Sequence, residues 1–591
     1  MKKKQGLRTI ASLTLTTAIV ASLTACGDGS NNESSTNSPA PSSEATNATA
    51  ANTEASGEVN PFGFSPAIDV KVGFSFDSNF QFQGGETESK NTWMDLYNEN
   101  GMKVTPMYSV DATQADTKLS TAIASGNYPD VFTLKGSNMV KYAQTGVIAD
   151  LTEAYEKYAT PELKAYMDID KGASLTSAKV DGKLYAIPKV QNAYDNAMMM
   201  FVRQDWLDNL GLKMPTTMDE LVEVARAFTK NDPDKNGKAD TYGLALNGKE
   251  GFSTVSGLQA FFEGYGAAPG HWNGNFTFIE KDGKVSWGGD LPDEMKKGLT
   301  VLQDMYKEGT LAKNFGTMDT AAINKDLGSG KAGISFAPMW GAMTPVMDAV
   351  KNDINAHFTS APIPDGNGTG SSKAYLSTLP DTYFVASSKF KNPEAVIKMA
   401  NLGVQKLIHP KDDEEFYKYY GKVGSYSGWK FSLVPLVNPL KNRDNFEKDY
   451  AALQSGDTTG LNVEQKTNYD KMKAYLDSVK DNSFPDKVKA SDTVVLSGLS
   501  SYTVFGDPQG GMVAQEKIRT TNTVNLSAYN YIPTDTMSSK YATLNKMALE
   551  TIVKIIYGEN VDSYDKFLKS WKALGGDTVT KEAQTWYDSN K

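Results

Sequence analysis

Residues 181–243 read DGKLYAIPKVQNAYDNAMMMFVRQDWLDNLGLKMPTTMDELVEVARAFTKNDPDKNGKADTYG, and the order of elements in this stretch indicates the fold. A polar turn leads into an apolar run that stops at Pro188, which predicts a strand because proline has no N–H to donate to a neighbouring strand. A second apolar run, residues 197–202, precedes a short helix. That helix is predicted to end at Gly211, since glycine favours the conformation that terminates helices.

A longer amphipathic helix follows. Thr217, with Glu220 three residues later, has the pattern of a capping box, in which each residue bonds a backbone N–H of the other. Apolar residues then recur at helical spacing and give the helix one apolar face: Met218, Leu221, Val222, Ala225 and Phe228. We expect this helix to end at Asn231, where an acidic loop begins.

The N-terminal part of the folded chain alternates strands and helices. Apolar patterning predicts strands at 67–76, 104–110 and 131–134, with helices at 92–98 and 113–125. This order implies a parallel sheet with ligand-facing loops at the carboxyl ends of its strands.

Several motifs together resemble one family. GKLYAIP (182–188) followed by RQDWLDNLGLKMPTTMDEL (203–221) is similar to the passage between lobes in extracellular solute-binding proteins of sugar ABC transporters. Four more motifs stand in that family's order: SGNYPDVF at 125–132, GVIADLTE at 146–153, KAGISFAPMW at 331–340 and KNPEAVIKMA at 391–400. The C-terminal segment from MALETIVKIIYGENV (547–561) resembles that of the large oligosaccharide binders, so the resemblance covers nearly the whole mature chain.

The resemblance implies the fold class: α/β, a two-lobed periplasmic-binding-protein-like fold of type II. Each lobe would be a mixed, mostly parallel sheet flanked by helices, with extra helical insertions. A chain of 591 residues also exceeds what one hydrophobic core usually spans. We expect a first lobe of 67–190 plus 383–430 and a second lobe of 191–382 plus 431–591. The pattern of residues 405–540 indicates secondary structure less clearly than the rest of the chain, and we expect several short helices there.

The later part of the chain carries further element signals. They predict a helix at 294–309, a strand at 333–336, a strand at 379–386 that returns the chain to the first lobe, and a helix at 393–402.

Residues 1–25 have the features of an export signal. Lys2, Lys3, Lys4 and Arg8 precede an apolar run too short to span a bilayer comfortably. Leu23-Thr-Ala-Cys26 matches the bacterial lipobox, which implies that the Cys26 thiol receives a diacylglycerol, with palmitate as the expected acyl chain. The alternative is an ordinary secreted protein with a stray cysteine.

Residues 26–66 contain little that could form a core and are interpreted as a disordered tether. A tethered lipoprotein suits the outer face of a Gram-positive cell membrane.

The acidic balance of the chain bears on its partners. The formal charge is −10, from 60 basic and 70 acidic residues. Without residues 1–25, which carry four basic residues and no acid, the balance is 56 against 70, or −14. This charge argues against nucleic acid as a partner. Cys26 is the single cysteine, so no internal disulfide forms, and the three histidines (His271, His357 and His409) are too scattered to suggest a zinc site.

The loop 232–240 has the spacing of a calcium-binding loop. Oxygen side chains stand at positions 1, 3, 5 and 9, glycine at 6 and a backbone carbonyl at 7, and the candidate ligands are Asp232, Asp234, Asn236, Lys238 and Asp240. The twelfth position is Gly243 rather than glutamate. Relatives in the oligosaccharide-binding group have an extra ligand just after the ninth position, where this chain has Thr241. We expect a structural Ca²⁺; the alternative is a surface turn without metal.

Sugar sites need aromatic faces for the C–H face of a pyranose, and polar side chains for its hydroxyls. Trp93, Trp206, Trp571 and Trp586 lie in helical contexts and are expected in the core. Tryptophans in loops marked by glycine or proline are candidate platforms, and polar candidates follow the first strand and the first crossover. The predicted ligand residues are Trp272, Trp340, Trp429, Tyr194, Asp195 and Asp77.

No catalytic constellation stands out in the sequence, so we expect a receptor rather than an enzyme. The resemblance implies a monomer that captures an oligosaccharide between its lobes and delivers it to ABC permease subunits. Two alternatives stay open: a surface glycosidase or lyase, because carboxylates are abundant, and a binder of peptides or another solute.

Overall fold

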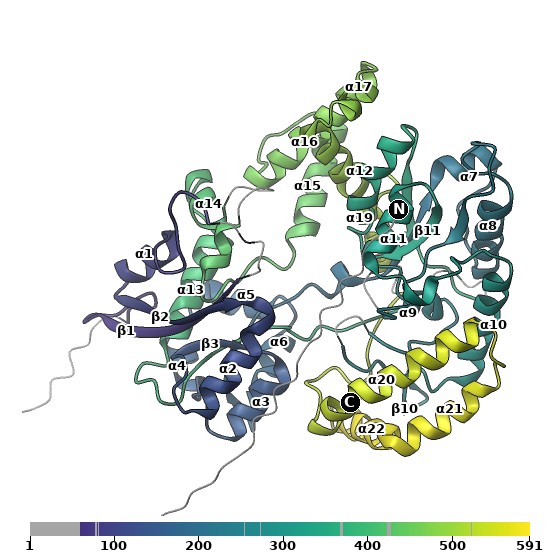
Figure 1. The fold of residues 1–591 in the computed structure, drawn as a ribbon. Coiled ribbons are helices and arrows are strands. Elements are labelled where there is room, and N and C mark those ends of the chain that lie inside the picture. The colour runs from purple at the N-terminus through teal and green to yellow at the C-terminus, as the bar shows by residue number, and fades with distance from the viewer. Residues whose placement is uncertain are drawn as a thin grey trace, which may run out of the picture. The chain divides into compact units, whose positions relative to one another are not determined.

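The computed structural model describes residues 59–76, 80, 82–252, 255–271, 274–366, 370, 372–421, 427–521 and 523–590 (Figure 1). Residues 59–591 form one compact unit. Its buried side chains gather into three large clusters, called the first, second and third cores below. Among the described helices, none is long and apolar enough to cross a membrane.

The first core surrounds a five-stranded sheet of order β2-β1-β3-β14-β6. Its strands are β1 (Ile68–Phe76), β2 (Met102–Asp111), β3 (Val131–Leu134), β6 (Ile187–Pro188) and β14 (Tyr383–Ala386). β1 pairs in parallel with β2 and β3, which confirms the predicted parallel arrangement. The returning strand β14 runs antiparallel to β3 and to β6. The beginning of β14 therefore lies at the same edge of the sheet as the ends of β3 and β6.

Helices pack around this sheet. They are α1 (Thr92–Glu99), α2 (Ala115–Ala124), α3 (Gly136–Gln144), α4 (Thr152–Tyr158), α5 (Pro161–Asp168), α6 (Ala173–Ser177), α13 (Ala395–Leu407) and α14 (Asp413–Tyr420), with the small hairpin β4 (Lys179–Val180) and β5 (Lys183–Leu184). Trp93 on α1 is fully buried and its indole N–H donates to the Tyr419 carbonyl at 3.1 Å, so its predicted core position is confirmed.

The second sheet has the order β12-β7-β11-β8. Its strands are β7 (Met199–Arg203), β8 (Tyr242–Leu244), β11 (Ala332–Ala337) and β12 (Phe358–Pro362), and the helices around it include α7 (Gln204–Leu210), α8 (Met218–Lys230), α9 (Leu258–Glu263), α10 (Pro292–Lys307), α11 (Thr320–Gly328) and α12 (Met343–Asn352). The second core fills one part of this region, with the predicted apolar face of α8 and Trp206 buried in it.

The start of α8 differs from the predicted capping box in one contact. The Thr217 hydroxyl accepts from the Glu220 N–H at 3.1 Å, as expected. The Glu220 carboxylate, however, accepts from the N–H and the hydroxyl of Thr216, both at 2.7 Å, and not from the backbone of Thr217. Thr216 offers two donors to the carboxylate, so the reciprocal contact lies one residue earlier.

Residues 441–520 form a helical insertion that packs on the second sheet through the third core. It contains α15 (Lys441–Ser455), α16 (Val463–Lys480), α17 (Phe484–Lys489), α18 (Thr493–Ser501), the π-helix η5 (Tyr502–Gly506) and α19 (Gly511–Thr520). Figure 1 shows α15, α16 and α17 as one group. The expected short helices are present as α14, α17, α18 and α19, and two longer helices, α15 and α16, have 15 and 18 residues. The capping box Asn462–Gln465 at the start of α16 marks this helix in the sequence.

The C-terminal helices complete the second core. α20 (Asp535–Ile556), α21 (Ser563–Trp571) and α22 (Asp577–Asn590) pack against α10 and the hairpin of β9 (Phe278–Lys281) and β10 (Lys284–Trp287), as the yellow helices of Figure 1 show. Trp571 is buried as predicted and stacks on Trp287 at 4.2 Å, whereas Trp586 on α22 is only half-buried. A short parallel pair, β13 (Ala374–Leu376) with β15 (Val524–Leu526), brings the end of the insertion beside the segment that leads to β14.

Candidate functional site

A cavity of about 440 Å³ lies at the carboxyl edge of the first sheet. One wall comes from Lys135, Gly136 and Ser137, which directly follow β3. Gln191 after β6 and residues 379–381 before β14 meet there, because β14 runs antiparallel to both neighbours. The opposite wall comes from His271, residues 274–278 and the chain around β13, β15 and α20. The cavity is thus lined both by residues of the first sheet and by residues that build the second core.

Six aromatic rings line this cavity: Phe276, Phe278, Tyr383, Tyr529, Tyr531 and Tyr541. Three of the tyrosines are held by hydrogen bonds. The Tyr383 hydroxyl bonds the Ser177 hydroxyl at 2.8 Å, Tyr531 donates to the Lys179 carbonyl at 3.1 Å, and Tyr529 donates to the Ile532 carbonyl at 2.5 Å. These bonds fix the rings before any ligand arrives, which lowers the entropic cost of binding.

Tyr541 differs from the other tyrosines. Its ring is half-buried and meets Phe276 edge-on at 5.1 Å, but its hydroxyl makes no hydrogen bond within the described part of the chain. Burial raises the pKa of Tyr541 to about 12, so the hydroxyl stays protonated at neutral pH. It can therefore donate to, or accept from, a ligand hydroxyl.

Seven of the other lining residues have uncharged polar side chains. They are Ser137, Gln191, Asn275, Thr277, Ser377, Ser527 and Ser538. Lys135 and Asp381 are both exposed at this edge. Rings beside hydroxyl and amide groups match the two faces of a sugar, one apolar and one polar.

A second, much smaller cavity of about 10 Å³ lies behind His271, which lines both spaces. Its size admits roughly one water molecule. Glu263 lines it and is fully buried; burial raises the pKa of its carboxyl to about 7. The Glu263 carboxylate accepts from Gln259 Nε2 at 2.8 Å and from the Tyr375 N–H at 3.2 Å. A protonatable carboxyl thus lies beneath the wall of the main cavity.

Two of the predicted ligand residues, Asp77 and Trp272, lie outside the described residues. The neighbours of Trp272, His271 and Gly274, do line the cavity. The role of Asp77 and Trp272 stays a prediction.

The other four predicted ligand residues are placed away from the lining of this cavity. Trp340 is exposed between β11 and α12, and Trp429 packs half-buried against the first core. Tyr194 and Asp195 form a 3₁₀ turn at the helical insertion, where the Asp195 carboxylate accepts from Asn442 at 2.9 Å and from Gln515 at 3.2 Å. Through these two hydrogen bonds, Asp195 connects the crossover between the lobes to the helical insertion.

The tyrosines of the C-terminal segment were missed by the sequence reasoning. The run SAYNYIP (527–533) places Tyr529 and Tyr531 on either side of Asn530, shortly before Thr534, the N-cap of α20. Alternating tyrosines in a polar loop before a helix are a weak signal of a binding surface. Tyr541 lies within α20 and carries no such signal, because its spacing fits a buried helix face equally well.

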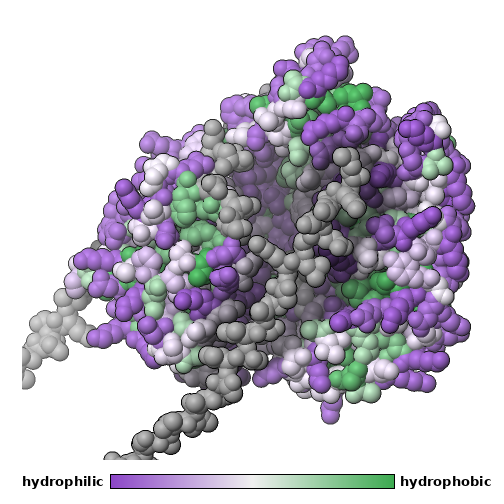
Figure 2. Space-filling view, in the orientation of Figure 1, coloured by the Kyte–Doolittle hydropathy of each residue, from purple (hydrophilic) through white to green (hydrophobic). Residues whose placement is uncertain are grey.

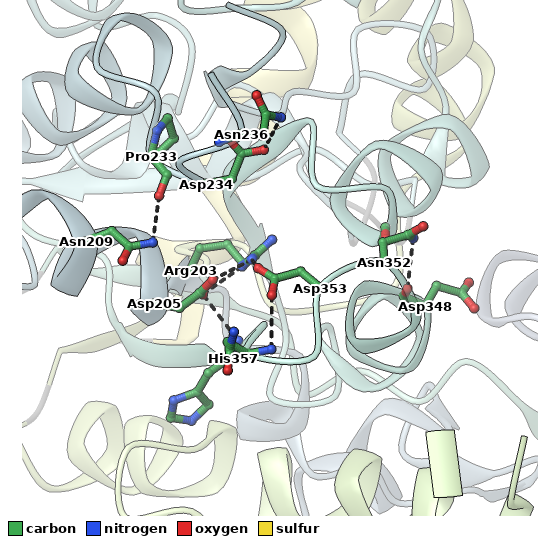
Figure 3. A network of polar contacts seen from close by, with 12 residues as sticks. Arg203, Asp205, Asn209, Pro233, Asp234, Asn236, Asp348, Asn352, Asp353 and His357 are labelled. Atoms are coloured by element: carbon green, nitrogen blue, oxygen red, sulfur yellow. Dashed lines mark hydrogen bonds and ion pairs between the residues drawn. The ribbon is translucent and has the colours of Figure 1, made fainter. Parts of the chain in front are cut away.

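The acidic loop 232–240 connects α8 to β8, and Figure 3 shows the Asn236 side chain beside that of Asp234. The Asn236 amide donates to Asp234 Oδ2 at 2.7 Å and to Asp240 Oδ1 at 3.2 Å. The Asp232 carboxylate accepts from the N–H groups of Asn236 at 3.1 Å and Gly237 at 3.0 Å. Gly237 has φ 77°, the left-handed conformation that the tight turn requires.

The loop offers the oxygen donors that Ca²⁺ prefers, but fewer than a complete calcium loop. Across the described ranges, no three acidic, histidine or cysteine side chains are already arranged around a metal position. The Thr241 hydroxyl is buried and donates to the Phe228 carbonyl at 2.7 Å, so it cannot replace the missing ligand. Gly243 cannot become the usual glutamate, since a Cβ there would lie 2.0 Å from the Ala225 carbonyl oxygen.

Like charge is concentrated in this loop. The pKa of Asp234 is raised, first by partial burial and then by the neighbouring carboxylates of Asp232 and Asp240. The Asn236 amide, with its two N–H groups on two of these carboxylates, takes the position of a positive charge. The residues therefore fit a cation in kind, with side-chain oxygens from Asp232, Asp234, Asn236 and Asp240, and Lys238 able to contribute its carbonyl.

The base of the acidic loop contacts the end of α7, and a separate polar network lies at the start of that helix (Figure 3). Asn209 at the end of α7 donates to the Pro233 carbonyl at 2.9 Å. At the start of α7, the buried Arg203 guanidinium bonds Asp205 at 2.8 Å and Asp353 at 3.1 Å. The acidic loop therefore contacts α7, and none of its residues is among those that line the cavity.

The two-lobed α/β fold with an aromatic cavity at a sheet edge defines a binding protein. The family of bacterial extracellular solute-binding proteins matches residues 83–408, and the chain belongs to this family. The predicted fold class and the resemblance stated from the sequence are confirmed. The family is one of solute-binding proteins and not of enzymes, which agrees with the prediction of a binding protein.

Two relatives and two solved structures show the range of the similarity. Lipoprotein LipO of Bacillus subtilis is 25% identical over 518 residues, which are 84% of this chain and 88% of LipO. The diacetylchitobiose binding protein DasA of Streptomyces coelicolor is 35% identical over 374 residues, 62% of this chain and 76% of DasA.

Among solved structures, an EF-hand mutant of the Streptococcus pneumoniae substrate-binding protein FusA in complex with fructo-nystose has a TM-score of 0.56 at 18% identity, covering 89% of this chain and 100% of that one. The alginate-binding protein AlgQ2 without calcium ion also has a TM-score of 0.56, at 17% identity, covering 90% and 100%. Both likenesses concern the fold.

Proposed function

We propose that the protein is the lipid-anchored substrate-binding component of a sugar ABC transporter and that it captures an oligosaccharide in the cavity of about 440 Å³. The observation that carries the proposal is the set of six aromatic rings beside short polar side chains at the carboxyl edge of the first sheet. The volume falls within the range of about 300–1,000 Å³ typical of small-molecule sites. The names of DasA and FusA, which describe sugar binders, support the ligand class.

Capture is coupled to the two lobes. The first lobe comprises 67–190 plus 383–430 and the second 191–382 plus 431–591. The separation of the first core from the other two supports this division in outline, but Phe431, Val434 and Leu436, just after the boundary, pack in the first core. Because both sides of the cavity contact the ligand, a bound sugar favours the closed arrangement over the open one. The permease then distinguishes loaded from empty receptor by this arrangement.

The test is titration of the purified mature protein with neutral and acidic oligosaccharides in a calorimeter, followed by chromatography of the sugars. Saturable binding with intact sugar supports the proposal. Turnover of the sugar would show an enzyme, and a screen in which only peptides bind would overturn the sugar assignment while leaving the family unchanged.

The anchor is Cys26. The lipobox Leu23-Thr-Ala-Cys26 and the name of the relative LipO support it. Two acyl chains hold a protein on a membrane where one does not. Cys26→Ala should release the protein into the medium or leave its signal peptide uncleaved, as mass spectrometry of the cell fraction would show; a variant that stays acylated would place the anchor elsewhere.

The acidic loop 232–240 holds one structural Ca²⁺. Its oxygen donors and the raised pKa of Asp234 support this assignment, together with the calcium and EF-hand named for AlgQ2 and FusA. The ion would neutralise crowded carboxylates and tie α8 to β8. Its test is given in the Discussion.

A further inference from the structure

We infer that the ligand is an uncharged oligosaccharide and that the cavity excludes acidic glycans such as oligouronides. The inference rests on the proposed function, since it names the class of sugar for the same cavity. It starts from the positively charged side chains among the described residues and from which of them line the cavity.

Arginine is the residue best suited to bind a carboxylate, because its planar guanidinium donates two parallel hydrogen bonds. The arginines of the chain are Arg8, in the signal segment, and four described residues: Arg203, Arg226, Arg443 and Arg519. None of these four lines the cavity. Each is already paired with acidic side chains: Arg203 with Asp205 and Asp353, Arg226 with Glu223 and Glu308, Arg443 with Glu447, and Arg519 with Glu516.

Lysine side chains also supply little positive charge to the cavity. Among the described lining residues, Lys135 is the one lysine, and its Nζ already pairs with Asp116 at 3.1 Å, with both side chains exposed. Asp381 brings a negative charge to the same lining. His271 also lines the cavity, with 7% of its surface exposed.

An oligouronide carries one carboxylate on every sugar unit. Moving such a carboxylate into this cavity would remove part of its water, and the one lysine among the described lining residues, Lys135, already pairs with Asp116, so the transfer is unfavourable. Asp381 would add like-charge repulsion, and the net charge of −14 after residue 25 would slow the approach of a polyanion. A neutral sugar meets none of these costs, and its hydroxyls match the serine, threonine, asparagine and tyrosine groups of the lining.

The experiment compares two ligands that differ only in charge: trigalacturonic acid and the trisaccharide obtained by reducing its three carboxyl groups to hydroxymethyl groups. Neutral fructo- and chito-oligosaccharides are titrated in parallel. All titrations are run at pH 8, and each is repeated at low and high NaCl concentration. We expect a neutral sugar to bind with a Kd that changes less than about twofold with salt, since no ion pair is screened.

A charge reversal in the cavity tests the same point. Asp381→Lys should raise affinity for trigalacturonic acid at least about threefold at low salt, while Asp486→Lys should leave it unchanged. Asp486 is a matched control because it lies on α17, away from the lining, with 84% of its side chain exposed. Equal effects of the two variants would show that net charge, and not the cavity, decides.

The outcomes separate the two proposals. Binding of acidic glycans alone, with a Kd that rises steeply with salt, would overturn the neutral class and keep the sugar receptor. If neither set of sugars binds, the proposed function fails and this inference fails with it. Tight binding of trigalacturonic acid and its reduced partner with equal Kd would also overturn the exclusion.

Discussion

The small cavity beside His271 and the acidic loop 232–240 both contain a carboxyl group whose pKa is raised, but the cause of the shift differs between the two regions. Glu263 is a single carboxyl whose pKa is raised to about 7 by complete burial. In the loop, the pKa of Asp234 is raised by partial burial and by two neighbouring carboxylates. At Glu263 a proton neutralises the carboxylate, because the group is buried away from ions in solution. A metal ion can relieve the exposed loop, because water and ions reach all three acids. The comparison teaches that burial depth decides which positive charge neutralises an acid.

The largest expected effect is on the pH dependence of stability at Glu263. Its folded pKa lies above the ordinary value of 4.5, so the folded protein binds the extra proton between about pH 4.5 and 7. The stabilisation is fully present below pH 4.5 and is lost as pH rises through 7, a difference of roughly 3 kcal/mol. Glu263→Gln should remove this part of the pH dependence and raise the melting temperature at pH 8.

The measurement is thermal unfolding at several pH values for wild type, Glu263→Gln and Asp449→Asn. Asp449 is the matched control, because burial also raises the pKa of its carboxyl to about 7, but it lies in the helical insertion. Each variant should remove the part of the pH dependence of stability that comes from its own carboxyl group. A Glu263→Gln protein with the same pH dependence as wild type would show that Glu263 ionises freely and that burial does not control it.

The second effect is on ligand affinity at Tyr541. Tyr541→Ala removes a ring from the cavity wall and should weaken oligosaccharide binding by about tenfold or more, which corresponds to roughly 1.5–3 kcal/mol. Tyr541→Phe keeps the ring and loses the hydroxyl, so it should cost about 0.5–1.5 kcal/mol. Calorimetric titration with the sugar found in the screen measures both.

Tyr417→Ala is the control for these variants. Tyr417 is 44% exposed on α14 and does not line the cavity, so its replacement should leave the Kd unchanged. If Tyr541→Ala binds as wild type does, the ligand lies elsewhere, and Trp340 or Trp429 becomes the next residue to replace.

The smallest effect is on stability at the acidic loop. If the loop binds Ca²⁺ with a Kd on the order of 10⁻⁴–10⁻³ M, millimolar Ca²⁺ should stabilise the fold by about 1 kcal/mol. A chelator should therefore lower the melting temperature slightly without changing sugar affinity. Asp232→Ala should abolish this calcium dependence.

Asp234→Asn gives the sharper test, because its two effects have opposite signs. It removes one of three crowded negative charges, so it should melt higher than wild type in chelator and gain less from added Ca²⁺. If the chelator does not change the melting temperature and elemental analysis finds no calcium, the loop is a turn without metal. Loss of sugar affinity on chelation, with the fold intact, would place the ion at the ligand site.

The sequence by itself determined the elements whose signals are local. The strands β1, β2 and β3, the helix α8 with its apolar face, and the loop 232–240 each lie in one short stretch, where periodicity, caps and residue spacing act between near neighbours. Ordered motifs were also enough to indicate the family, because their succession reflects the path of the chain between the lobes.

Only the tertiary structure decided the composition of the cavity. Ser137, Gln191, Asp381 and Tyr541 are far apart in the chain and meet because β14 returns antiparallel to β3 and α20 closes the opposite wall. Long-range pairing also placed Asp195 against Asn442 and buried Glu263 beneath Tyr375. The burial and charge environment of a side chain depend on which distant segments pack around it. The spacing of residues along one segment does not reveal those distant partners.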